Sequence, residues 1–402
     1  MKIAIIGAGP AGIMAALEAR KKQAEILLID ANPSVGRKLA ATGSGRCNLT
    51  NTHAQPERYF TSAPEQLVKV FSRFGNKDLI TWLENLGIFT YASEDGWVYP
   101  LSNSAQNVVD ILAAHLNEVG IEKHLQTLIT DIQLVGKQFH LSTQDPSRSF
   151  MADRVIIAAG GPAAPQLGAR DNIYAILKKL EQPILPVEPA LAPLLTDVKR
   201  FHKLQGVRLD AGVTLLADGR EIGNTMGNII FTNWGLNGPG VMDLSHLISQ
   251  HTNGELELRL DFLPNHEPLF QELLHKKNRS GIPILILLES FLPSKIARFI
   301  LDQCHLPEDK PMNKVLESEF NLLSETLHNQ KVTVKGVKGF KDCQLSTGGV
   351  PLSEIDPDSM QSLKVNGLFF AGEILDVNGP CGGYNLQWAF TSGFVAGNHA
   401  QE

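Results

Sequence analysis

Three glycines near the start of the chain have the spacing of a dinucleotide-binding turn. Gly7, Gly9 and Gly12 lie between KIAII at residues 2–6, which predicts a buried strand, and IMAALEARKK, which predicts a helix. The first glycine allows a tight turn, the second lets a pyrophosphate approach the backbone, and the third lets helix and strand pack closely. The helix N-terminus then offers free N–H groups to the phosphates. The alternative is a glycine turn with a purely structural role.

An acidic residue follows at the place where such sites bind ribose. The run EILLID predicts a second strand that ends at Asp30, with Ala31 beside it. A carboxylate here accepts hydrogen bonds from ribose hydroxyls, and it repels a 2′-phosphate, which disfavours NADP in this turn. NAD and FAD both remain open at this point.

The next stretch is basic and glycine-rich, and it suits the second half of FAD. It reads GRKLAATGSGRCNLTN at residues 36–51 and contains no acid. FAD carries a flavin arm beyond its pyrophosphate, and this arm needs further contacts. Arg37 and Lys38 are suited to phosphate or ribose, and the backbone of residues 43–45 can pass close to a flat ring. The alternative is a solvated loop with incidental charges.

Two later segments favour FAD over NAD. DRVIIAAGG at residues 153–161 predicts a strand that ends in the small residues Ala159 and Gly160, near the nucleotide half of FAD. Residues 366–400 predict a strand, the pair Gly372–Glu373, a glycine-rich loop and a helix that begins near Asn385. The carboxylate is suited to ribityl or phosphate-linked hydroxyls. The positive end of the helix is suited to the flavin N1–C2=O edge, where it stabilises the anionic reduced ring. The alternative is a C-terminal packing helix.

Three long motifs resemble one family of bacterial flavoproteins. They are GRKLAATGSGRCNLTN (36–51), TGGVPLSEIDPDSM (347–360) and GLFFAGEILDVNGPCGGYNLQWAFTSGFVAG (367–397). Together they resemble the BaiN/RdsA family of NAD(P)/FAD-dependent oxidoreductases over nearly the whole chain. The resemblance implies an α/β protein, with a Rossmann-like FAD domain of the two-dinucleotide-binding type and an inserted β-barrel plus helical region. It also implies non-covalent FAD, and some members of the family are linked to reducing carbon–carbon double bonds.

The resemblance also implies a set of FAD contacts. Carried onto this chain, they are Gly7, Ala8, Gly9, Pro10, Ala11, Gly12, Asp30, Arg37, Lys38, Ser44, Gly45, Arg46, Cys47, Asn48, Gly372, Glu373, Tyr384, Asn385 and Leu386. We add Ala31 beside Asp30, Ala159 and Gly160 at their strand end, and Ile129, which lies where a backbone contact to adenine is common.

The FAD domain is predicted to be split by an insertion. Residues 1–188 form its first part, residues 189–335 the insertion, and residues 336–402 its C-terminal part. In the first part, helices are predicted near 64–86 and 104–119, and QTLITDIQLV and KQFHLST form a hairpin. The proline-rich passage at 182–194 marks the exit.

Strand and helix patterns both occur in the insertion. The Asp218–Gly219 turn separates two strand-like runs, which predicts a hairpin. ELELRLD at residues 255–261 alternates as a strand does, and residues 265–328 are mainly helical in pattern.

Composition limits the class of protein. The chain has 402 residues, 43% of them hydrophobic, and a net charge of −6, so no basic excess favours a nucleic acid or an anionic membrane. Cys47, Cys304, Cys343 and Cys381 are far apart and match no zinc pattern, so we expect reduced thiols, no metal and a cytoplasmic location. The oligomeric state stays open.

The predicted chemistry is hydride transfer through FAD. NAD(P)H would reduce the flavin, which would pass a hydride to a small organic, unsaturated substrate. Only one strand–glycine–helix unit is evident, so NAD(P)H would bind transiently over the flavin, or another donor would act. The candidate catalytic residues are Tyr384, Cys47, Asn233 and Trp234. The alternatives are a flavin-dependent RNA-modifying protein and a non-catalytic FAD-binding sensor.

Overall fold

The chain folds into two compact units. The computed structural model describes the whole chain except residues 22, 252–253, 265, 267–271, 273–280 and 402. One unit comprises Met1–Glu188 and Gln344–Glu402, and the other comprises Pro189–Cys343. The sequence predicted a return to the first unit at residue 336. The structure places the return at Gln344, because the strand Gln330–Val337 (β17) belongs to the barrel of the second unit.

A five-stranded parallel sheet forms the centre of the first unit. Its order is β19-β10-β1-β2-β6, and every neighbouring pair is parallel. The strands are β1 (Lys2–Ile6), β2 (Glu25–Ile29), β6 (Glu122–His124), β10 (Arg154–Ile157) and β19 (Leu368–Phe370). Because the carboxyl ends of parallel strands meet at one edge, the residues after β1, β2, β10 and β19 converge.

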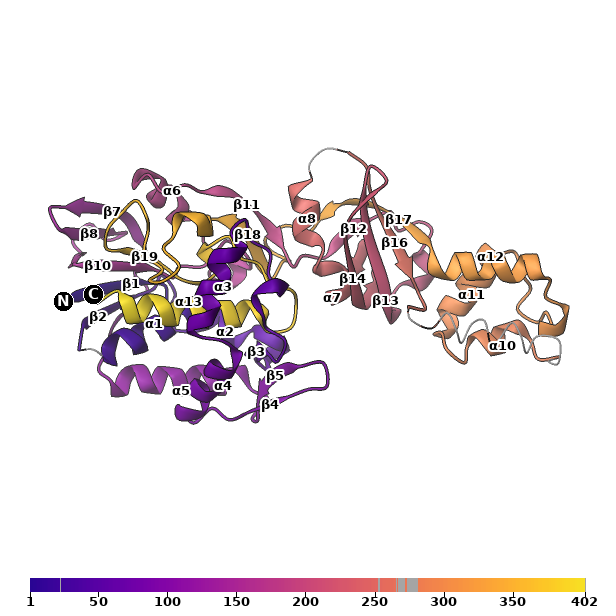
Figure 1. Cartoon of the computed structure of the whole chain (residues 1–402), viewed down its shortest axis with the longest axis horizontal. Helices are drawn as coiled ribbons and strands as arrows, with labels where there is room; N and C mark the ends of the chain where they lie inside the picture. Colours follow the sequence, from indigo (N-terminus) through magenta and orange to yellow (C-terminus); the bar gives the residue numbers. More distant parts are fainter. Residues whose placement is uncertain (22, 252–253, 265, 267–271, 273–280, 402) are drawn as a thin grey trace. The chain divides into compact units, whose positions relative to one another are not determined.

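Two helices that are far apart in the sequence pack closely in this unit. Figure 1 shows α1 (Pro10–Lys21) beside α13 (Tyr384–His399). A Cβ atom added to Gly393 would lie 2.4 Å from the Ala11 carbonyl oxygen, and one added to Gly397 would lie 2.5 Å from that of Ala15. Only glycine allows the two backbones to come this close.

Smaller elements complete the first unit. Its other helices are α2 (Arg37–Ala40), α3 (Pro64–Arg73), α4 (Asn76–Asn85), α5 (Ala105–Glu118) and α6 (Asn172–Lys179). Three further sheets join β3 (Thr50–Asn51), β5 (Trp97–Pro100) and β4 (Thr90–Ala92); β7 (Ile129–Val135), β8 (Gln138–Thr143) and β9 (Ser149–Ala152); and β11 (Leu185–Ala190) with β18 (Leu345–Gly349). The helices predicted near 64–86 and 104–119 and the hairpin of β7 and β8 are confirmed.

The second unit contains a closed barrel. Its strands run β12 (Leu194–Thr196), β15 (Gly235–Asn237), β14 (Arg220–Phe231), β13 (Arg208–Ala217), β16 (Leu256–Asp261) and β17. The Asp218–Gly219 turn joins β13 to β14 as predicted. The described helices of this unit are α7 (Pro239–Met242), α8 (Ser245–Gln250), α10 (Ile284–Leu288), α11 (Ser294–Gln303) and α12 (Glu317–His328).

The helical pattern predicted for 265–328 is therefore confirmed in part. Residues 265, 267–271 and 273–280 lie outside the described residues. Within the part of the chain that the structure describes, no helix is both long enough and apolar enough to cross a membrane.

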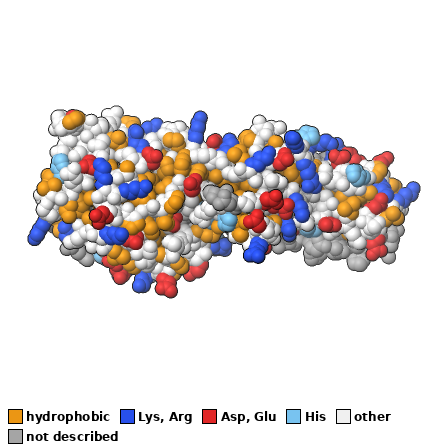
Figure 2. Space-filling view, turned by 90° about the horizontal axis from the view of Figure 1, so that it is seen from above, with side chains coloured by type: hydrophobic (Ala, Val, Ile, Leu, Met, Phe, Trp, Pro, Cys, Tyr) orange, Lys and Arg blue, Asp and Glu red, His pale blue; other side chains and the backbone are white. Residues whose placement is uncertain are grey.

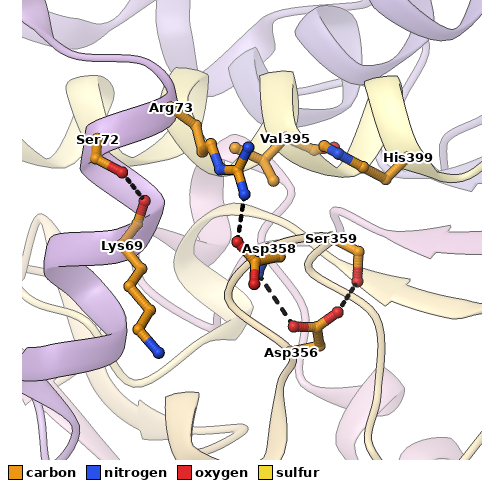
Figure 3. A network of polar contacts seen from close by, with 8 residues as sticks. All are labelled: Lys69, Ser72, Arg73, Asp356, Asp358, Ser359, Val395 and His399. Carbon is orange, nitrogen blue, oxygen red and sulfur yellow. Dashed lines mark hydrogen bonds and ion pairs between the residues drawn. The ribbon is translucent and has the colours of Figure 1, made fainter.

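A surface network holds the connection between β18 and β19 against α3. The Arg73 guanidinium pairs with the Asp358 carboxylate, and the Asp358 N–H donates to Asp356 Oδ1 at 3.1 Å (Figure 3). The hydrogen bond from Arg73 holds the pKa of Asp358 below its usual range. Ser359 Oγ donates to the other Asp356 oxygen at 2.6 Å. These contacts hold the chain in position as it returns to the parallel sheet.

We expect Gly397→Ala to lower the free energy of unfolding by about 1–3 kcal/mol, because an added methyl group overpacks a fixed helix contact. Urea denaturation followed by circular dichroism measures the change. Gly339→Ala is the matched control, since a Cβ atom there has no neighbour within 4 Å. Equal midpoints for the two variants would contradict the close helix packing.

Candidate functional site

The first glycine turn has two packed positions and one open position. A Cβ atom on Gly7, whose φ is +108°, would lie 2.3 Å from the Ala158 carbonyl oxygen, and one on Gly12 would lie 1.8 Å from that of Gly7. A Cβ atom on Gly9 would have no neighbour within 4 Å. Gly7 and Gly12 are therefore fixed by packing, while the backbone at Gly9 is open to a ligand.

The helix after this turn begins earlier than predicted. The apolar pattern placed its start at Ile13, whereas α1 starts at Pro10. Proline is favoured in the first helical turn because its φ is already helical and the N–H that it lacks would have no partner there. The turn therefore carries the N-terminus of α1 directly, as an anion site requires.

Asp30 lies at the carboxyl end of β2 and holds the turn in place. Its Oδ2 accepts a hydrogen bond from the Ala8 N–H at 2.6 Å, and its Oδ1 accepts one from the Asn32 N–H at 2.7 Å. The Asp30 carbonyl accepts from the Thr127 N–H at 2.8 Å. Ile129 follows at the start of β7, buried, with its carbonyl accepting from Asn172 Nδ2 at 2.9 Å. The segment that carries Ile129 therefore runs beside Asp30, the residue predicted to bind the ribose hydroxyls.

A lysine, a glutamate and a serine join the N-terminal and C-terminal motifs. Lys38 Nζ lies 2.8 Å from Glu373 Oε2. Glu373 Oε1 accepts from the backbone N–H of Ser346 at 3.0 Å and from its hydroxyl at 2.9 Å. Gly160 lies beside them, since a Cβ atom there would be 4.0 Å from Glu373 Oε2. The structure thus brings together three chain segments that the sequence assigned to one cofactor.

Sequence reasoning missed Ser346, although a signal for it was present. This serine directly precedes the TGGVPLSEIDPDSM motif. It is buried, and a Cβ atom on Gly161 would lie 2.0 Å from its hydroxyl oxygen. Nearby, Asp376 Oδ1 accepts from the Gly348 N–H at 2.9 Å. Burial raises the pKa of the Asp376 carboxyl above its usual range.

The basic loop turns sharply and leaves one buried acceptor unpaired. Left-handed backbone conformations occur at Gly43, Ser44, Gly45 and Cys47, with φ between +56° and +86°. Asn48 is buried, and its Oδ1 has no hydrogen-bond partner among the described residues. Buried polar atoms are normally paired. A bound ligand that donates a hydrogen bond at this point fits the observation.

This unpaired acceptor lies at the start of α13. A Cβ atom on Gly383, the residue before the helix, would lie 2.8 Å from Asn48 Oδ1. In the first turn, the Asn385 side chain holds the preceding loop, donating to the Gly379 carbonyl and accepting from its N–H, each at 2.8 Å. The positive end of the helix and the unpaired oxygen thus lie side by side, and a ring with both N–H and C=O groups, such as isoalloxazine, suits that pair.

The four candidate catalytic residues have different surroundings. Cys47 is fully buried, and burial raises the pKa of its thiol to about 11. The Tyr384 carbonyl accepts from the Tyr59 hydroxyl at 2.8 Å. Asn233 and Trp234 belong to the second unit, where Lys338 Nζ lies 4.2 Å from the centre of the Trp234 ring. Cys47 and Tyr384 belong to the first unit.

Comparison with known proteins now identifies the family. Residues 1–399 match the family model described as the HI0933-like protein Rossmann domain. The chain belongs to this family. It is therefore an FAD-dependent oxidoreductase with a Rossmann-type fold, and the sequence predictions of the fold class, including the inserted barrel, and of FAD-dependent redox chemistry are confirmed.

Similar proteins cover the whole length. The chain is 32% identical over 408 residues to a 3-dehydro-bile acid Δ4,6-reductase of Clostridium scindens, covering 100% of this chain and 99% of the relative. It is 28% identical over 397 residues to a ribosomal RNA dihydrouridine synthase of Haemophilus influenzae, covering 97% and 96%. A solved 3-ketosteroid-Δ4-(5α)-dehydrogenase of Rhodococcus jostii has a TM-score of 0.51 at 14% identity, covering 100% of this chain and 96% of its own. The last likeness shows the fold alone.

We expect Glu373→Gln to weaken FAD binding by about 10- to 100-fold, because hydrogen bonds to a charged group are worth roughly 1.5–3 kcal/mol. Quenching of FAD fluorescence on titration into apoprotein measures the Kd. Glu354→Gln is the control, since the Glu354 carboxylate is partly exposed and lies 3.7 Å from Lys364 Nζ. An unchanged Kd in a folded Glu373→Gln protein would remove Glu373 from the site.

We expect Cys47 to resist alkylation by iodoacetamide at pH 8. With a pKa of about 11, its thiolate is scarce at that pH, and the side chain is buried. Peptide mapping by mass spectrometry measures the modification, and the same reaction in urea is the control in which Cys47 should react. Rapid modification of Cys47 in the native protein would contradict this assignment.

Proposed function

We propose that the protein uses NADH or NADPH to reduce bound FAD and then saturates a carbon–carbon double bond in a small organic substrate. The proposal rests on the full-length similarity of this chain to two relatives that are named for the same type of reaction. A bile acid Δ4,6-reductase and a dihydrouridine synthase both add hydrogen across a ring double bond next to a carbonyl group. That shared reaction is the proposed activity here.

The residues of the site support this proposal in distinct ways. The open turn at Gly9 and the N-terminus of α1 would bind the pyrophosphate, and Lys38 and Glu373 would hold hydroxyl or phosphate groups further along. Asn48 Oδ1 and the start of α13 would fix the edge of the ring. When bound, FAD supplies two-electron hydride transfer. The positive end of α13 favours the negative charge of the reduced ring.

The nicotinamide donor would bind only transiently. The chain contains one strand–glycine–helix unit of the dinucleotide type, and the second unit is a barrel with helices. The described residues therefore provide no second fold of the dinucleotide type to hold a nucleotide stably. We propose that NADH or NADPH approaches the face of the flavin, transfers its hydride and leaves before the substrate binds.

A small substrate is favoured over RNA by the distribution of charge. Residues 189–343 contain 17 Lys and Arg against 18 Asp and Glu, and the rest of the chain contains 19 against 24. On the face drawn in Figure 2, positive and negative side chains are interspersed. Nucleic-acid binding depends on a basic surface. RNA modification remains the second candidate, because the Haemophilus influenzae relative is named for it.

An anaerobic stopped-flow experiment tests the proposed function. We expect NADH or NADPH to bleach the flavin absorbance near about 450 nm, which is a property of the cofactor, and 2-cyclohexenone or 4-androstene-3,17-dione to restore it. Bleaching by dithionite but by neither nucleotide would overturn the proposed donor. Reoxidation by a uridine-containing ribosomal RNA fragment, but by neither enone, would favour the second candidate.

A further inference from the structure

Arg46 carries a positive charge that no acidic group of the described structure neutralises. Its side chain is exposed and contacts Tyr99 in two ways, by stacking on the ring and by a hydrogen bond. Its Cζ atom lies 4.6 Å from the centre of the Tyr99 ring, and its Nη2 donates to the Tyr99 hydroxyl at 3.3 Å. Stacking on a ring holds a guanidinium flat while leaving most of its N–H donors free.

The ring beneath Arg46 is firmly held. Tyr99 lies on β5, is only 4% exposed, and packs against Tyr91 and Trp97 with ring centres 5.9 and 6.4 Å away. β5 pairs with β3, which begins shortly after Arg46. On β3, the Thr50 hydroxyl donates to the Gln387 side chain of α13. The sheet that carries Tyr99, on which Arg46 stacks, therefore contacts α13. The N-terminus of α13 faces the proposed flavin position.

The aromatic cluster of Tyr99, Trp97 and Tyr91 contacts both loops of the proposed flavin site. A Cβ atom on Gly43 would lie 3.6 Å from Tyr99 Cε1, and one on Gly382 would lie 3.0 Å from Trp97 Nε1. Gly43 belongs to the basic loop, and Gly382 precedes α13. The phosphates are already provided for at Gly9 and the start of α1. Arg46 is therefore supported by an aromatic cluster that also contacts both loops of the proposed ring end of the site.

We propose that Arg46, held flat on Tyr99, is a catalytic residue that binds the carbonyl oxygen conjugated with the substrate double bond. This inference rests on the proposed function and assigns a substrate class to it, namely planar cyclic enones or ring amides of the same electronic kind. A guanidinium is suited to such an oxygen because it is permanently charged and presents its donors in a fixed plane.

The balanced step defines what Arg46 does. A hydride, supplied originally by the nicotinamide donor, forms a C–H bond at the β-carbon of the substrate. The π electrons of the double bond then move toward the carbonyl, and its oxygen becomes an enolate oxyanion. Arg46 stabilises this oxyanion by charged hydrogen bonds. Water then supplies a proton to the α-carbon, and the carbonyl reforms. The substrate gains two electrons, and the nicotinamide loses two.

The test uses a phenolate as a stable imitation of the enolate. Oxidised, FAD-loaded protein is titrated with 4-hydroxybenzaldehyde at pH 8.5, and the change in the flavin spectrum gives the Kd. We expect Arg46→Gln to raise this Kd by about 10- to 100-fold, since charged hydrogen bonds are lost, and Arg46→Lys to raise it less. Each variant is reloaded with FAD before the titration, and its FAD content is measured, so that the change in Kd reports phenolate binding and not loss of the cofactor. Arg58→Gln, which removes another exposed arginine of the same unit, is the control.

Reoxidation of the reduced protein by 2-cyclohexenone gives a second measurement. We expect its rate constant to fall in Arg46→Gln by a factor similar to that in the Kd. Phenolate binding that is as tight in Arg46→Gln as in the wild type would overturn the proposal. Loss of FAD from Arg46→Gln, with phenolate binding to the reloaded protein unchanged, would overturn it as well and make Arg46 a cofactor ligand. If neither NADH nor NADPH reduced the flavin, the proposed electron donor would be wrong. The proposal for Arg46 would still be tested, because the phenolate titration uses oxidised protein.

Discussion

The close contact between α1 and α13 is the constraint on which the site depends. Gly393 and Gly397 let the backbone of α13 lie directly on the carbonyl groups of α1. This contact places the last helix of the chain beside the first glycine turn, although most of the sequence separates them. Gly372 adds to it, because a Cβ atom there would lie 2.9 Å from Ala11 Cβ. Larger residues at these positions would push the C-terminal motif away from the pyrophosphate turn.

Positive groups are proposed for both ends of the site, the phosphate end and the ring end. The start of α1 and Lys38 provide positive charge where phosphates are expected, and Glu373 balances Lys38 through a contact of 2.8 Å. At the other end, the start of α13 and Arg46 provide positive charge where a reduced ring and a developing oxyanion are expected. Asp30 and Glu373 are held by backbone and side-chain donors, so their carboxylates are oriented before a ligand arrives.

The family relationship narrows the chemistry more than the substrate. Relatives of similar identity are named for a bile acid and for ribosomal RNA. Their substrates differ greatly in size and charge, yet both contain a ring double bond conjugated with a carbonyl group. A group that recognises this conjugated unit, rather than the rest of the substrate, would serve every member that shares the reaction. Arg46 on Tyr99 has the position and the charge for such a role.

The sequence by itself determined the cofactor class and most of the elements. Glycine spacing, Asp30 at a strand end and the C-terminal strand–loop–helix depend on local residue order, so they can be recognised without coordinates. Tertiary structure alone decided which distant groups meet. The contacts of Ser346 with Glu373, of Tyr99 with Arg46 and of Gly383 with Asn48 come from packing between distant segments. The motifs assigned some of these segments to one cofactor, but they did not say which side chains would meet. The end of the insertion at Cys343 was likewise set by barrel closure through β17, a long-range pairing that local propensity does not encode.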